Sequence, residues 1–145
     1  MNHIINLIND EKKQLLKALK HLDYSYNKIN KFSAHVDSDD DENLEIWESF
    51  SARFSRVVDI FLSKFVRSYI LYNDPGFKGS LRDHINTAEK LSLIDDSNWW
   101  LGLRELRNIA AHEYNNDDIA QFYSRLYYEC PRLLQLELTL KNIVL

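Results

Sequence analysis

The sequence contains few residues that break helices or cross-link chains. Its 145 residues include only 3 Gly, 2 Pro and 1 Cys. So few glycines and prolines leave few interruptions, which favours long regular elements. The single cysteine, Cys130, has no internal partner for a disulfide, and a cytoplasmic location is the natural expectation.

Other absences exclude whole classes of protein. No apolar run approaches the roughly 20 residues of a membrane span, and charges from Asp10 onward come too early for a signal peptide. Gly76, Gly79 and Gly102 do not form a glycine-rich phosphate loop. No two of the 5 histidines have the spacing of a helical metal-ligand pair. We therefore expect no membrane association, no metal and no cofactor.

The charge is unevenly distributed along the chain. The net charge is −4, which argues against broad, non-specific binding of nucleic acid. The segment 51–112 is nevertheless slightly basic, with 9 Lys and Arg against 7 Asp and Glu. An acidic run at about 37–42 is interpreted as a loop that caps the next helix, since it lacks the glycine of a calcium loop. A small local anion site fits this distribution better than a long RNA-binding groove.

Apolar residues recur at helical spacing almost throughout, and no alternating strand pattern or internal repeat is present. We predict an all-α protein, an antiparallel bundle of four to five helices in a single domain, 1–145. The first helix should end at about Phe32. A second, at about 43–73, carries the strongest apolar stripe and should form the core. Pro75 and Gly76 should follow its end.

Three further helices complete the prediction. Ser80 and Asp83 resemble a capping box that starts a third helix, ending near Leu93. A fourth should begin after a cap at 95–97. A fifth should run from about 117 to 140, and Pro131 should kink or split it.

The most informative segment begins at Arg107 and ends at Tyr114, with Asn108 and His112 between them. Arginine stays charged and binds phosphate oxygens through a planar fork. Histidine is the side chain whose unperturbed titration spans neutral pH. Together these groups can hold a phosphodiester and move a proton, and the nearby Arg104 could support the phosphate contact.

The spacing limits how Arg107 and His112 can meet. Five positions on an undistorted helix turn by about 140°, so the two side chains would not share a face. Either the helix ends near Ala111, or each Arg meets a His from another chain, and both can hold together. Ala110 permits close helix approach, consistent with a two-fold interface. Taken one at a time, these residues are more often surface, capping or packing residues.

Arg107-Asn108, His112 and Tyr114 together resemble the signature of the HEPN superfamily and, more narrowly, of HepT-type toxins paired with small nucleotidyltransferase antitoxins. The likeness covers roughly 45–135. It extends to these segments: Arg53-Phe54-Ser55-Arg56, Gly79-Ser80-Leu81-Arg82-Asp83, Glu89-Lys90-Leu91, and Trp100 with Leu103-Arg104-Glu105-Leu106.

The resemblance implies a homodimeric helical bundle that cleaves RNA without metal. Arg107 would bind the scissile phosphate, His112 would act as general acid or base, and Asn108 would orient the phosphate or the imidazole. Tyr114 matches the position that the antitoxin can modify with a nucleotide, which would bring negative charge beside Arg107.

Three functions remain open at the level of sequence. The first is an endoribonuclease toxin neutralised by a nucleotidyltransferase. The second is a non-catalytic subunit that binds the nucleotide or substrate of a nucleotidyltransferase. The third is a helical interaction module without chemistry. Cleavage of RNA in chelator, lost in Arg107→Ala and His112→Ala, would separate the first from the others.

Overall fold

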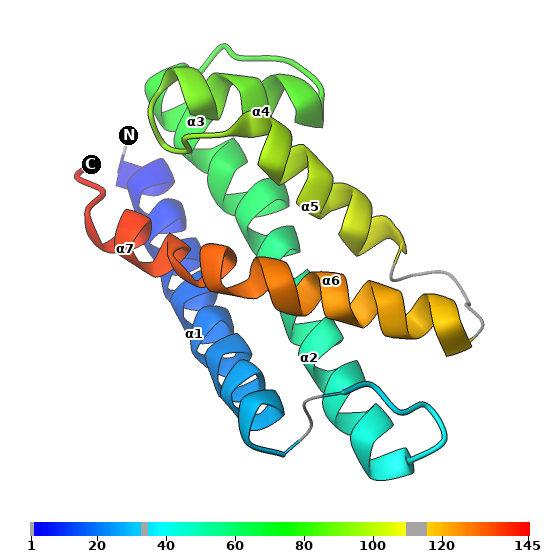
Figure 1. Ribbon diagram of the computed structural model, residues 1–145. Coiled ribbons are helices and arrows are strands. Elements are labelled where there is room, and N and C mark those ends of the chain that lie inside the picture. The colour runs from blue at the N-terminus through cyan, green and yellow to red at the C-terminus, as the bar shows by residue number, and fades with distance from the viewer. Residues whose placement is uncertain (1, 33–34, 110–115) are drawn as a thin grey trace.

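The computed structural model describes residues 2–32, 35–109 and 116–145, and this part of the chain is all α-helical (Figure 1). The elements are α1 (Asn2–Phe32), α2 (Asp41–Ile60), η1 (Phe61–Phe65), α3 (Val66–Asn73), α4 (Leu81–Lys90), α5 (Ser97–Ile109), α6 (Asn116–Leu134) and α7 (Leu136–Lys141). Because α2, η1 and α3 are continuous and only Gln135 separates α6 from α7, the described residues form five rods. This confirms the predicted all-α bundle.

The core lies between α1 and the α2–η1–α3 rod, which run antiparallel (Figure 1). Phe50, Phe54, Phe61 and Phe65 of the rod are fully buried, and Leu15 and Leu22 of α1 are buried with them. Burying an aromatic or leucine side chain stabilises the fold by about 1.5–3 kcal/mol. The strongest apolar stripe of the sequence therefore forms the centre of the molecule, as predicted.

A π-helical turn, η1, interrupts the second rod, and the sequence prediction missed it. Buried apolar pairs recur every four residues, at 57–58, 61–62 and 65–66. An α-helix repeats every 3.6 residues, so a four-residue repeat drifts by about 40° each time. The wider π turn absorbs this drift and keeps the pairs in the core.

The helix ends agree closely with the predicted caps. The carboxylate of Asp40 accepts from the backbone N–H groups of Glu42 and Asn43, so the acidic loop ends at Asp40 and Asp41 already begins α2. Ser80 and Asp83 form the capping box of α4. That helix ends at Lys90 rather than near Leu93, because Ser92 adopts a left-handed conformation with φ of 61°.

The last rod breaks near Pro131 but not at it. Pro131 lies inside α6, and the helix ends three residues later, at Leu134. There the N–H of Gln135 donates to the carbonyl of Arg132, three residues back, at 3.2 Å. Cys130 is fully buried. No helix in the described ranges combines the length and apolarity of a membrane span.

Candidate functional site

Arg107 lies in the last turn of α5, at the edge of that helix's buried face. The buried face consists of Trp100, Leu103 and Leu106. The ring centroids of Trp100 and Phe61 are 4.4 Å apart. The packing of α5 against the second rod therefore fixes where Arg107 emerges. Arg104, one turn earlier, is exposed on the same side of the helix.

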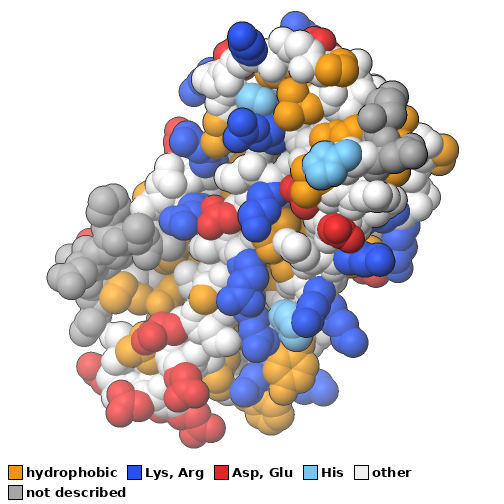
Figure 2. Space-filling view, turned by 180° about the vertical axis from the view of Figure 1, so that it is seen from behind, with side chains coloured by type: hydrophobic (Ala, Val, Ile, Leu, Met, Phe, Trp, Pro, Cys, Tyr) orange, Lys and Arg blue, Asp and Glu red, His pale blue; other side chains and the backbone are white. Residues whose placement is uncertain are grey.

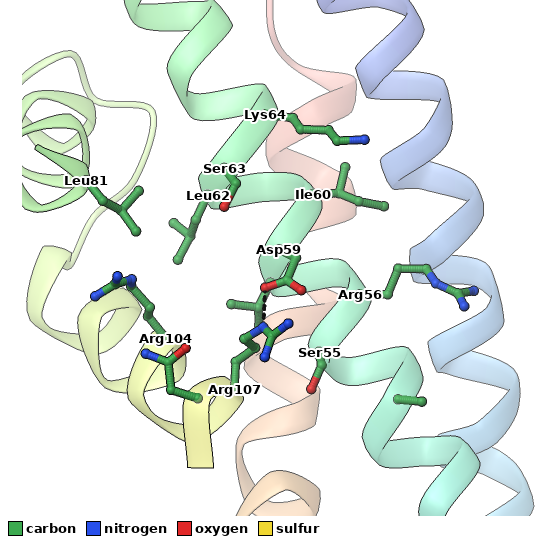
Figure 3. A pocket seen from close by; sticks show the side chains of 13 residues that line it. Ser55, Arg56, Asp59, Ile60, Leu62, Ser63, Lys64, Leu81, Arg104 and Arg107 are labelled. Atoms are coloured by element: carbon green, nitrogen blue, oxygen red, sulfur yellow. Dashed lines mark hydrogen bonds and ion pairs between the residues drawn. The ribbon is translucent and has the colours of Figure 1, made fainter. Parts of the chain in front are cut away.

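An ion pair with Asp59 of α2 orients the guanidinium of Arg107. Its Nε donates to Oδ1 of Asp59 at 2.7 Å (Figure 3). The hydrogen bond from Arg107 to Asp59, and then the charge of that carboxylate, raise the pKa of Arg107 above its usual value. The two side chains are 37% and 42% exposed. Among the residues that the structure describes, only Asp59 bonds to this guanidinium, and it does so through Nε. The two terminal nitrogens can therefore bind an anion.

An open cleft of about 720 Å³ surrounds this ion pair. Its lining residues come from α2, η1, α4 and α5: Ala52, Ser55, Arg56, Val58, Asp59, Ile60, Leu62, Ser63, Lys64, Leu81, Arg104, Arg107 and Asn108. Arg104 and Arg107 approach from α5, while Arg56 and Lys64 stand on the opposite rim (Figure 3). The described lining of the cleft thus carries four cationic side chains and one carboxylate, and this excess of positive charge favours an anionic ligand.

The structure brings together three of the five predicted site residues, since Arg104, Arg107 and Asn108 all line the cleft. His112 and Tyr114 lie outside the described residues. The described part of the chain contains no cluster of His, Cys, Asp and Glu that could hold a metal ion.

Sequence reasoning missed Asp59, Arg56 and Lys64 as members of the site. Asp59 directly follows the buried pair Val57–Val58, so a charged residue at the edge of the strongest apolar stripe was the available signal. The neighbouring Arg53 has a structural role instead. Its guanidinium donates to the carbonyl of His21 and to the hydroxyl of Ser25, which ties α2 to α1.

The two adjacent tryptophans, Trp99 and Trp100, pack against other side chains rather than presenting a free stacking surface. Trp100 is buried. Trp99 donates its Nε1–H to Glu129 at 2.7 Å, and the guanidinium of Arg132 lies 4.3 Å from the centroid of its ring. On α6, Tyr123 and Tyr127 pack against the core, whereas Tyr128 is 80% exposed.

Residues 12–140 match the protein family described as nucleotidyltransferase substrate binding protein like. No curated protein and no solved structure matches the chain. The matched range includes the whole cleft and extends from α1 into α7. This family is part of the HEPN superfamily, so the resemblance is confirmed at that level. The chain belongs to the nucleotidyltransferase substrate-binding-protein-like family of the HEPN superfamily.

Proposed function

We propose that this protein is a HepT-type endoribonuclease, a toxin that acts as a homodimer and is neutralised by a nucleotidyltransferase antitoxin. The cleft around Arg107 supports the proposal most strongly. It holds four cationic side chains, and Asp59 binds the Nε of Arg107, while no other described residue bonds to the two terminal nitrogens. Such a preorganised donor pair suits the charge that develops on a phosphodiester during cleavage.

In the proposed reaction the ribose 2′-hydroxyl attacks the adjacent phosphorus. The bond to the 5′-oxygen of the next nucleotide breaks, which leaves a cyclic phosphate and a free 5′-hydroxyl. Arg107 stabilises the phosphoryl oxygens, and Asn108 orients the phosphate. One His112 takes the proton of the 2′-hydroxyl, and the His112 of the second subunit protonates the leaving oxygen. Water is needed only to open the cyclic product.

Cleavage of RNA by the purified protein in chelator tests this function. His112→Ala should lower the rate by about 10²–10⁴-fold, the usual contribution of general acid–base catalysis. Arg107→Ala should lower it on a similar scale, because it removes the donors to the transition-state charge. Arg125→Ala is the matched control, since Arg125 is exposed on α6 and is not among the lining residues of the cleft.

Two outcomes would contradict the proposal. One is the absence of cleavage by the unmodified protein. The other is cleavage that survives in both variants, which would point to a contaminating nuclease. The partner is tested separately. A nucleotidyltransferase supplied with nucleotide should add mass to the unmodified protein and not to Tyr114→Phe, and the addition should reduce cleavage.

A second candidate function is the non-catalytic binding subunit of a nucleotidyltransferase. The description of the matched family favours it, because that description refers to substrate binding. The same cleft would then hold a nucleotide through its phosphates. Nucleotide binding that depends on Arg107, without RNA cleavage, would support this function over the first.

A further inference from the structure

A second cavity, of about 500 Å³, continues the cleft along the α2–η1–α3 rod. The two cavities share Leu62, Ser63 and Leu81, so they form one groove. The remaining residues of the second cavity are Arg67, Leu71, Phe77, Lys78, Gly79 and His84. They come from α3, from the segment between α3 and α4, and from the first turn of α4.

Among the described residues that line the second cavity, some are cationic and none is acidic. Arg67 and Lys78 are exposed, and neither forms an ion pair with any residue that the structure describes. His84 lies 2.7 Å from the carbonyl oxygen of Ser80 through Nδ1. Since a carbonyl only accepts, Nδ1 donates there, and the ring packs edge-on against Phe77.

The backbone next to Lys78 approaches the first turn of α4 closely. A Cβ on Gly79 would come within 2.8 Å of the Cβ of Asp83, so only glycine permits this approach. The approach allows Asp83 to accept from the N–H of Ser80 at 2.8 Å within the capping box. The capping box occupies the amides of Ser80 and Asp83. The charges that the cavity offers to a ligand lie on the side chains of Arg67 and Lys78.

Charge along the whole groove contrasts with charge on the whole chain. The described lining of the groove carries Arg56, Lys64, Arg67, Lys78, Arg104 and Arg107 and one carboxylate, Asp59, although the chain has a net charge of −4. Figure 2 shows Lys and Arg side chains down the middle of this face, while Asp and Glu gather toward the end where α2 begins. Such segregation attracts a polyanion to one face only.

The geometry points to a second phosphate subsite at Arg67 and Lys78, which holds the neighbouring phosphate of a single-stranded RNA whose scissile phosphate lies at Arg107. This inference rests on the proposed function and extends it to the substrate class. The apolar surface of Leu62 and Leu81 lies where the two cavities join and would contact the intervening nucleoside. Each cavity falls in the range of about 300–1,000 Å³ that suits a small ligand, so a single strand fits better than a duplex.

The first test measures binding without any need for activity. A fluorescent, 2′-O-methylated RNA oligonucleotide cannot be cleaved through its 2′-oxygen, and its affinity is measured at several salt concentrations. The double variant Arg67→Ala/Lys78→Ala should bind about 2- to 30-fold more weakly, the factor that two exposed charge contacts supply. The slope of log affinity against log salt should fall by about 0.7 for each lost contact. Arg125→Ala/Lys90→Ala removes the same charge outside both cavities and should bind like the unmodified protein.

The second test compares substrates by length. A dinucleoside monophosphate has one phosphodiester and should be cleaved equally by the unmodified protein and by Arg67→Ala/Lys78→Ala. A longer oligonucleotide should be cleaved with a higher kcat/KM by the unmodified protein, and the variant should lose this advantage.

Binding and cleavage that are the same in the two double variants would overturn the subsite while leaving the proposed function intact. Unchanged RNA binding together with lost binding of the nucleotidyltransferase would assign the groove to the protein partner, and would also overturn it. Absence of cleavage, with binding that still depends on Arg67 and Lys78, would remove the ribonuclease proposal alone. Thermal melting of each variant verifies its fold.

Discussion

Replacing Asp59 by Asn tests how the cleft prepares Arg107. Asparagine keeps an oxygen that can accept from Nε but removes the negative charge. The ion pair is 37% and 42% exposed, so it contributes only about 0–1 kcal/mol to stability. For a domain of this size, the melting temperature should therefore fall by no more than about 4 °C. Any large effect of Asp59→Asn should appear in ligand binding instead.

The expected gain in anion affinity follows from Coulomb's law. A phosphate on the open fork of Arg107 would lie roughly 6 Å from a carboxylate on its Nε. The repulsion is about 0.7 kcal/mol in water and about 3 kcal/mol at an effective dielectric constant of 20. Removing it should strengthen binding between about 3-fold and about 100-fold. Because the cleft is open to solvent, we expect a value toward the lower end of this range.

Calorimetric titration with inorganic phosphate at fixed ionic strength measures this gain. Asp59→Ala provides the comparison, since it removes both the charge and the acceptor, and it should gain less affinity than Asp59→Asn. Asp10→Asn, an exposed change on α1 outside the cavities, controls for net charge. Equal affinities for Asp59→Asn and Asp10→Asn would refute the reasoning, as would weaker binding by Asp59→Asn.

Three further predictions concern the scaffold. Phe54→Ala should lower the free energy of unfolding by about 3–5 kcal/mol in denaturant titrations, because Phe54 is fully buried, whereas Phe32→Ala at an exposed site should change it by less than about 0.5 kcal/mol. Burial raises the pKa of the Cys130 thiol, so a thiol reagent should react with it only after denaturation, and rapid labelling of the native protein would contradict its burial. Hydrogen bonds from the backbone and then the side chain of Ser97 lower the pKa of Glu89 below 4.5; its stabilisation is therefore present above about pH 4.5 and lost as the pH falls through the lowered value. Glu89→Gln should accordingly lower the melting temperature at pH 7 and do so less at pH 3.

The local sequence pattern predicted most of the helices of the scaffold. The apolar stripes that end at Phe32 and Asn73 gave the two long rods, and Ser80 with Asp83 gave the start of α4. The π turn escaped prediction because a four-residue repeat was treated as an ordinary helical stripe. The end of α4 was placed too late because nothing in the sequence required Ser92 to adopt positive φ.

The candidate site was predictable only on one helix. Arg104, Arg107 and Asn108 are close in sequence and line the cleft together. Asp59 is 48 residues away from Arg107, and the contact depends on how α2 packs against α5. Helical periodicity shows which face of each helix is buried, but it does not show which residues meet across two packed helices. The partner that orients Arg107 therefore emerged only from the fold.

The most direct test of the central claim is a crystal structure of the protein with a dinucleotide that lacks the attacking 2′-hydroxyl. The proposed function predicts the phosphate within about 2.7–3.2 Å of the terminal nitrogens of Arg107 and of an imidazole nitrogen of His112, from the same or the partner subunit. A phosphate bound elsewhere, or Arg107 and His112 directed into separate regions of solvent, would contradict it.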